Sequence, residues 1–286
     1  MPDRTKATPQ AATVGTAGIL RPEEFARHVD LVRLPPAPDL APWVENHWVL
    51  RWSLPDGFAY PSQVLPHPTM NLTVERGVRR PGAPPAAVLV TGPVTRRFDV
   101  ETVGSGWVWG VRFRPGGLPA LAGVEAAALA ERTVAAADLL PDDVVAALDA
   151  VHDTGGALGD GLERVEAALR PLVGARRAPD PDHQLVLAVM ADMLADRTLL
   201  RVAQVTERHG VSVRRLQRLF ARYVGLGPKW VLARHRMHDV VTALDAGWSG
   251  SLADLAAQHG WYDQAHFTRD FRALVGVTPA QYRERR

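Results

Sequence analysis

The sequence predicts an α+β protein with a β-rich N-terminal domain, a helical annex and an all-α C-terminal domain that carries two helix-turn-helix units. Two observations lead to this fold class. Short apolar runs broken by proline and glycine fill residues 40–113, whereas helical spacing of apolar residues dominates the rest of the chain. The 286 residues, 47% hydrophobic and 22% charged, have an ordinary globular composition and suffice for about two domains.

Three apolar runs, at residues 47–52, 87–90 and 107–113, predict β-strands. The third run places its large apolar residues at every second position, which puts them on one face of a sheet. These residues are Trp107, Trp109, Val111 and Phe113. A small β barrel or sandwich is the expected result, followed by an alanine- and leucine-rich helical annex that runs to about Leu172.

The expected domain boundaries follow from changes in composition. Residues 1–20 lack an apolar period and are interpreted as a disordered tail. Residues 21–173 form the β-rich domain with its annex, and residues 183–286 form the C-terminal domain. Between them, residues 174–182 combine glycine, two prolines and charges, which is typical of an exposed linker.

Charge and cysteine content exclude several classes of function. Residues 197–286 contain 15 Lys and Arg against 7 Asp and Glu, whereas the remainder contains 18 against 24, so the C-terminal part favours a polyanionic partner. The sequence contains no cysteine, which rules out disulfides, thiolate metal sites and cysteine nucleophiles. It also lacks the apolar stretch of a secretory signal or a membrane span, so we expect a soluble, cytoplasmic protein.

The C-terminal domain begins with a helix predicted from His183 to Ala195, followed by a first helix-turn-helix unit. The segment 202–209 predicts a short helix that ends at Gly210, and Ser212 caps a second helix predicted over 213–223. One face of this second helix is apolar. The opposite face carries Arg214, Arg215, Gln217, Arg218 and Arg222.

The same pattern recurs 50 residues later, with Gly260 in the place of Gly210. A short helix over 251–259 precedes it, with Ser251 and Asp254 spaced as a capping box. A second helix follows over 263–274, with its phenylalanines facing inward. Between the units, Pro228 begins a predicted helix that runs to Asp245, about 25 Å long. A spacer of that order can hold two helices about one turn of duplex, 34 Å, apart.

Residues 199–283 resemble the AraC/XylS family of transcriptional regulators. The densest match is GWYDQAHFTRDFRALVGVTPAQYR at 260–283, against the family pattern G-F-x-D-x-S-x-F-x-R-x-F-K-x-x-x-G-x-T-P-x-x-Y-R. Trp261 replaces the usual Phe and Ala265 the usual Ser. The resemblance implies a DNA-binding transcription factor that is not an enzyme, needs no cofactor or metal, and binds double-stranded DNA.

The resemblance also assigns roles to exposed residues of both units. The positions that would contact bases are Arg214, Gln217 and Arg218 in the first unit, and Gln264, Ala265, His266 and Arg269 in the second. Phosphate contacts are expected from Arg215, Arg222 and Arg272. Ala265 would touch at most a thymine methyl group, and His266 could contact either a base or a phosphate.

By the same resemblance, the N-terminal domain senses a small molecule or mediates self-association, often through a cupin-like fold. Two stretches, residues 66–72 and 112–117, resemble uncharacterised sensor domains of such regulators. Homodimer and monomer both remain open, RNA polymerase is a further candidate partner, and no membrane partner is expected. Aromatic and histidine side chains could line an effector pocket, although strand-spaced aromatics more often form core. The candidates are Trp48, Trp52, His67, Trp107 and Trp109.

Two other functions remain as alternatives. One is a cupin-like metal-dependent enzyme domain fused to a DNA-binding module. Against it, His28, His47 and His67 are isolated and lack the H-x-H spacing of a metal site. The other is an architectural DNA binder without sequence preference. Gln217 and Gln264 argue against that reading, because neutral amides suit base edges better than phosphates.

Overall fold

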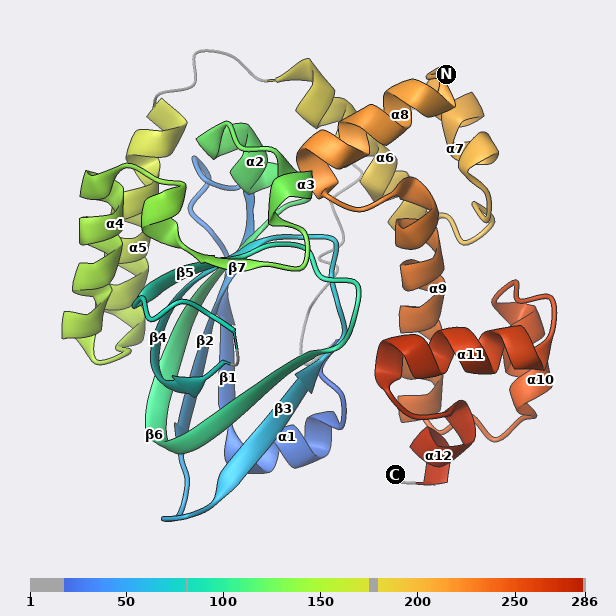
Figure 1. The fold of residues 1–286 in the computed structure, drawn as a ribbon, viewed down its shortest axis with the longest axis horizontal. Coiled ribbons are helices and arrows are strands. Elements are labelled where there is room, and N and C mark those ends of the chain that lie inside the picture. Colours follow the sequence, from blue (N-terminus) through green and yellow to red (C-terminus); the bar gives the residue numbers. More distant parts are fainter. Residues whose placement is uncertain (1–17, 81, 175–179, 285–286) are drawn as a thin grey trace.

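The computed structural model describes residues 18–80, 82–174 and 180–284, and it divides into a β-rich N-terminal domain and a helical C-terminal domain that lie side by side (Figure 1). This arrangement confirms the predicted fold class. Among the described helices, none combines the length and the apolar content needed to cross a membrane.

The N-terminal strands form one connected antiparallel sheet. Its order is β1-β2-β6-β4-β5-β7, and β3 pairs with β6 beside this path. The strands are β1 (Asp30–Leu34), β2 (Val44–Ser53), β3 (Ala59–Val64), β4 (Asn71–Arg79), β5 (Val88–Thr91), β6 (Phe98–Phe113) and β7 (Thr133–Ala135). The 16-residue strand β6 is central, because β2, β3 and β4 all pair with it.

Helices cover one face of this sheet, as Figure 1 shows for α4 and α5. The helical elements of the N-terminal domain are α1 (Pro22–His28), α2 (Gly117–Ala122), α3 (Ala126–Leu129), α4 (Asp142–Asp149) and α5 (Leu158–Gly174), with short 3-10 turns η1 (Ala136–Asp138) and η2 (Ala150–Thr154). The predicted apolar face of β6 is confirmed, since Trp109, Val111 and Phe113 are fully buried in the cluster beneath α4 and α5. Val108 and Arg112, which alternate with them, are also buried. Both faces of this half of β6 are therefore covered.

The ends of the N-terminal domain differ from the boundaries expected from composition. Residues 1–17 of the predicted tail lie outside the described residues, but Ile19 and Leu20 are buried, and Ile19 forms a β-bridge with Val64. The tail assignment is wrong for these two residues, because their apolar side chains pack into two core clusters. The linker predicted over residues 174–182 is also too long at both ends, because Gly174 belongs to α5 and Pro181 begins α6. Residues 175–179 lie outside the described part of the chain.

The C-terminal domain consists of two helical units joined by one long helix. The first contains α6 (Pro181–Ala195), α7 (Val202–His209) and α8 (Val213–Leu219), which continues into a π-helical turn η3 (Phe220–Val224). The joining helix is α9 (Pro228–Asp245). The second unit contains α10 (Leu252–Gln258), α11 (Gln264–Val275) and α12 (Pro279–Glu284). Figure 1 shows α9 running from the first unit to the second.

Each unit has its own apolar cluster, and α9 contributes to both. Val231 and Leu232 of α9 belong to the first cluster with Leu216 and Phe220. Val240, Val241 and Leu244 of α9 belong to the second cluster. This cluster also contains Leu255 of α10 and Phe267 and Phe271 of α11. The predicted inward faces of both second helices are thus confirmed.

We expect Phe267→Ala to lower the free energy of unfolding by about 3–5 kcal/mol, because the Phe267 ring is fully buried between Trp261 and Phe271. Urea unfolding of the full chain measures the loss. The control is His266→Ala on the exposed face of the same helix, which should change the stability by less than about 0.5 kcal/mol. Equal losses for the two variants would contradict the assigned orientation of α11.

Candidate nucleic-acid interface

The first candidate surface is the outer face of α8. Gly210 adopts a left-handed conformation (φ 61°), which only glycine adopts without strain, and so turns the chain sharply from α7 into α8. The Ser212 hydroxyl then accepts a hydrogen bond from the Arg215 backbone N–H at 3.2 Å and fixes the start of α8. With Leu216 and Leu219 buried, Arg214, Gln217 and Arg218 are exposed on the opposite face.

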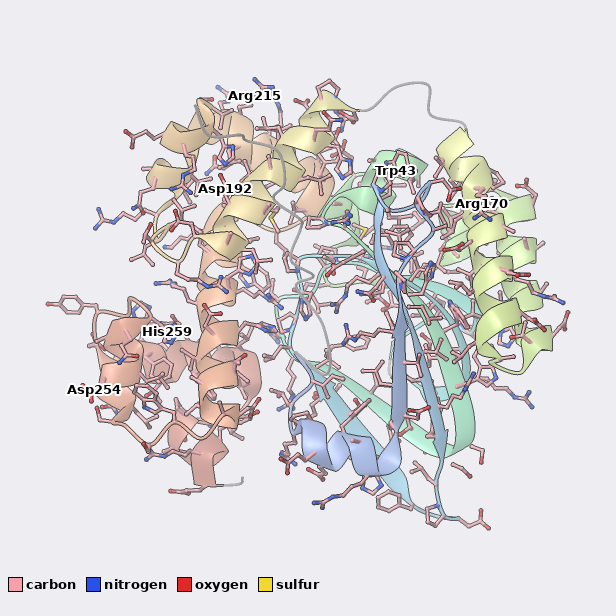
Figure 2. All side chains as sticks on the ribbon, turned by 180° about the vertical axis from the view of Figure 1, so that it is seen from behind. Trp43, Arg170, Asp192, Arg215, Asp254 and His259 are labelled. Atoms are coloured by element: carbon pink, nitrogen blue, oxygen red, sulfur yellow. The ribbon has the colours of Figure 1, made fainter. Side chains whose placement is uncertain are left out.

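Two further arginines of this unit are already engaged with the protein. Arg215 forms an ion pair with Asp182 at 3.2 Å, which links α8 to the start of α6. The Arg222 guanidinium lies 5.0 Å from the centre of the Tyr223 ring. Both side chains remain exposed at the edge of the unit, and Arg215 projects from that edge in Figure 2. An edge position suits contact with a phosphate better than contact with a base.

The second candidate surface is the outer face of α11, and it is built in the same way. Gly260 is left-handed (φ 78°), and the Asp263 carboxylate caps α11 by accepting from the His266 backbone N–H at 2.7 Å. A shallow, open groove follows the exposed face of α11 to the residue before α12. It is lined by Gln264, Ala265, Thr268, Arg269, Arg272, Ala273 and Thr278.

His266 lies beside this groove and is held in place by a neighbour one turn along α11. Its Nε2 lies 3.2 Å from a carboxylate oxygen of Asp270, which also accepts a hydrogen bond from the Trp261 indole at 2.9 Å. The imidazole is half exposed. Asp270 thus orients the ring while leaving its outer edge open to a partner.

Six polar side chains of the two faces make no hydrogen bond, ion pair or ring contact with any of the described residues. They are Arg214, Gln217, Arg218, Gln264, Arg269 and Arg272. A guanidinium can donate two parallel hydrogen bonds to a guanine edge, and an amide can pair with an adenine edge. The two faces therefore present the donors and acceptors that base recognition in a major groove requires.

The sequence analysis missed several residues of these surfaces. Tyr262, in the turn before α11, is 96% exposed, and Val213 at the first position of α8 is 44% exposed. Thr268 and Thr278 line the groove. No local signal in the sequence distinguishes exposed Tyr262 from its neighbour Trp261, which is buried in the cluster of the second unit.

The five residues named for an effector pocket are not brought together by the structure. Trp107 and Trp109 belong to the core cluster beneath α4 and α5, where Trp109 is fully buried. Trp48 and Trp52 lie across Gly110 and Gly106 of β6 and pack into a different cluster. His67 contacts the C-terminal domain instead. The tryptophans thus fill the core on two sides of the sheet.

The histidines weighed as metal ligands are also apart. Buried His47 lies 3.4 Å from Glu166, whereas His28 stacks on Tyr60 with ring centres 4.7 Å apart. Over residues 18–80, 82–174 and 180–284, no three His, Asp or Glu side chains are placed so that they could hold a metal ion.

The N-terminal domain contacts both units and the helix between them. On the first unit, His183 Nε2 lies 3.0 Å from the Pro115 carbonyl oxygen, and Gly225 lies against Pro93 and Ala126. On the second unit, Arg97 donates to the Val275 carbonyl oxygen at 2.8 Å. Figure 2 shows the C-terminal helices along one side of the sheet and the α5 residue Arg170 on the other. The sheet domain therefore contacts both of the units that carry the candidate surfaces.

Comparisons with known proteins agree with this division of the chain. Residues 32–135 match the model of a domain of unknown function (DUF6597), and residues 185–285 match the model of a helix-turn-helix domain. Among curated proteins, the probable transcription factor PqrA of Proteus vulgaris is 28% identical over 85 residues, which cover 30% of this chain and 69% of that protein. The match to PqrA covers less than a third of this chain.

Two solved structures are similar in outline. ToxT from Vibrio cholerae O395 is 10% identical with a TM-score of 0.37, covering 90% of this chain and 96% of its own. The AraC-like transcriptional activator CuxR is 14% identical with a TM-score of 0.24, covering 77% of this chain and 89% of its own. Because both TM-scores are below 0.5, neither likeness supports a conclusion about this chain.

We expect Gly225→Ala to destabilise the chain by about 1–3 kcal/mol more than Gly210→Ala. Both glycines have positive φ, so both variants carry the strain of a left-handed residue. A Cβ at Gly225 would also lie 2.7 Å from Pro93 and 2.8 Å from the Ala126 carbonyl oxygen, whereas a Cβ at Gly210 would meet nothing within 4 Å. Thermal unfolding of the two variants measures the difference. Equal losses would show that the close packing of Gly225 against the N-terminal domain contributes nothing to the stability of the chain.

Proposed function

We propose that the chain is an AraC-type DNA-binding transcriptional regulator, which reads a specific duplex sequence with two recognition helices, α8 and α11. Arg214, Gln217 and Arg218 read bases in one major groove. Gln264, Ala265, His266 and Arg269 read bases in the next groove, and Arg215, Arg222 and Arg272 contact phosphates.

The observation that carries this proposal is the free state of the two faces. The arginines and glutamines that would read bases are exposed and, within the described residues, have no partner in the chain itself. A side chain with a structural role would contact other residues of the chain. Fixing a long polar side chain costs conformational entropy, and such a contact offsets that cost. Because α9 packs in the apolar clusters of both units, it keeps the distance between the two faces fixed. Binding to successive grooves on one side of DNA requires such a fixed distance.

The mixture of charged and neutral readers favours sequence preference over purely electrostatic binding. A binder without sequence preference needs cations that follow the phosphates. Here Gln217 and Gln264 lie beside arginines on the two faces. A neutral amide gains little from a phosphate, whereas it can form paired hydrogen bonds with a base edge. The metal-dependent enzyme is the weaker alternative, because the sheet domain offers its histidines at separate places.

Control of DNA binding by the N-terminal domain is part of the proposal. An effector that binds the sheet domain would change either its docking against the two units or its self-association, and so bias an equilibrium between two states. We propose that the protein acts in the cytoplasm, as a monomer or homodimer, with RNA polymerase as a downstream partner. Measuring DNA affinity and oligomer size together, with and without a candidate effector, separates the two routes of control.

We expect the affinity for a cognate duplex to exceed that for a random duplex of equal length by about 10³-fold or more. Direct base contacts supply this ratio, whereas phosphate contacts are common to both duplexes. Raising the salt concentration should weaken both, because bound cations are released from each. Competition binding at two salt concentrations measures both effects. Equal affinity for the two duplexes would contradict the regulator that we propose.

We expect Arg218→Ala to cost about 1–3 kcal/mol of binding free energy on the cognate duplex and to remove the preference at one base pair. The reason is the loss of paired hydrogen bonds to a base edge. The matched control is Arg222→Ala, four residues along the same helical segment, which should weaken every duplex to a similar extent. If Arg218→Ala also weakens all duplexes equally, Arg218 contacts a phosphate instead of a base.

A further inference from the structure

A cluster of basic side chains is buried where the N-terminal domain meets α9. Arg234 of α9 is 5% exposed and His235 is 7% exposed, although both lie in the helix that joins the two DNA-binding units. His238, one turn further, and His67, in the loop between β3 and β4, complete the cluster. The sequence analysis treated α9 as a spacer and gave Arg234, His235 and His238 no role, and it named His67 only as a candidate for an effector pocket and as an isolated histidine.

Arg234 connects the two domains through its hydrogen bonds. Its Nε donates to the Pro66 carbonyl oxygen at 2.6 Å, and one Nη donates both to His67 Nδ1, at 2.6 Å, and to His238 Nε2. Within the described residues, the guanidinium forms no ion pair with a carboxylate. A guanidinium can only donate, so both imidazoles must present a lone pair to it and must therefore be neutral.

The charges around the cluster also oppose protonation of these histidines. Burial, followed by the charge of Arg234, holds the pKa of His67 and of His238 well below 6.5. The pKa of His235 falls to about 3 for the same reasons. The surrounding charged groups come from four other places: Glu45 of β2, Arg112 of β6, Arg197 before α7, and Asp239 of α9, which is ion-paired with Arg197 at 2.8 Å.

We propose that Arg234, His67 and His238 form a proton-sensitive latch, which holds the N-terminal domain against α9 at neutral pH and releases it in mild acid. Protonation of either imidazole replaces an acceptor with a second donor facing Arg234 and adds a positive charge beside a buried guanidinium. The contact of Arg234 with His67 or His238 is then lost, which weakens the docking of the N-terminal domain against α9 and shifts the equilibrium toward an open state.

The sign and size of the effect follow from proton linkage. A histidine in the open state has a pKa of about 6.5, and in the latch it stays neutral, so the latch is fully closed above that pH and weakens as the pH falls below it. At one pH unit below, each histidine raises the ratio of open to closed molecules by about 11-fold. His67 and His238 together therefore raise it by on the order of 100-fold at pH 5.5.

The test is a measurement of the distance between the domains as a function of pH. Because the chain has no cysteine, Arg96→Cys in the N-terminal domain and Ala257→Cys in α10, both exposed positions, allow two dyes to be attached for single-molecule energy transfer on the full chain. We expect one compact population at pH 7.5 and a growing open population below pH 6.5, without loss of helical circular dichroism. No change down to pH 5, or loss of helix over the same range, would overturn the proposal.

The variant His67→Gln/His238→Gln provides neutral acceptors that cannot be protonated, so its ratio of open to closed molecules should rise about 100-fold less than that of wild type between pH 7.5 and pH 5.5. The matched control His28→Gln removes a histidine that stacks on Tyr60 in the N-terminal domain and should keep the wild-type response. A double variant that opens at the same pH as wild type would overturn the latch. Should the double variant not fold, the ¹⁵N-histidine resonances of wild type decide: a pKa of 6.5 or above for His67 or His238 contradicts the proposal.

Discussion

The arrangement of the DNA-binding part depends on the burial of two helix faces against one common helix. The inner faces of α8 and α11 are anchored in separate apolar clusters, and α9 enters both. Because packed interiors resist small displacements, neither recognition helix can turn about its axis without breaking its cluster. The exposed faces inherit their direction from this packing. In the proposed complex with two major grooves, the geometry of the two faces comes from apolar contacts that do not touch DNA.

The N-terminal domain adds a second constraint, because it contacts both units and the helix between them. Leu20 and Leu65 of the N-terminal domain enter the cluster of the second unit, and Ala120 enters that of the first. The domains therefore share interior surface instead of meeting only through polar groups. Interfaces within a chain that bury apolar surface restrict relative domain motion. Any signal received by the sheet domain can reach the DNA-binding faces through this shared interior.

The C-terminal domain was predictable because its signals are local. Glycine at a left-handed turn, a capping side chain two residues later and apolar residues at helical spacing all act within about 15 residues, as at Gly210, Ser212 and Leu216. The sheet was less predictable, since the pairing of β6 with three strands joins residues far apart in sequence. The burial of Arg234 was not predicted, because it depends on contacts with Pro66 and His67, which lie 168 and 167 residues away in the sequence. A signal existed for α9, where arginine and histidines interrupt an apolar face.

The lack of contacts at the six side chains that we propose to contact bases and phosphates bears on how such proteins diverge. Substitutions at exposed positions without partners change folding stability little, commonly within about 0.5 kcal/mol. Under the proposed mode of binding, mutations at Gln217 or Arg269 therefore alter which operator is recognised while the scaffold stays intact. Duplicated copies of a gene could acquire separate targets one residue at a time, with every intermediate still folded.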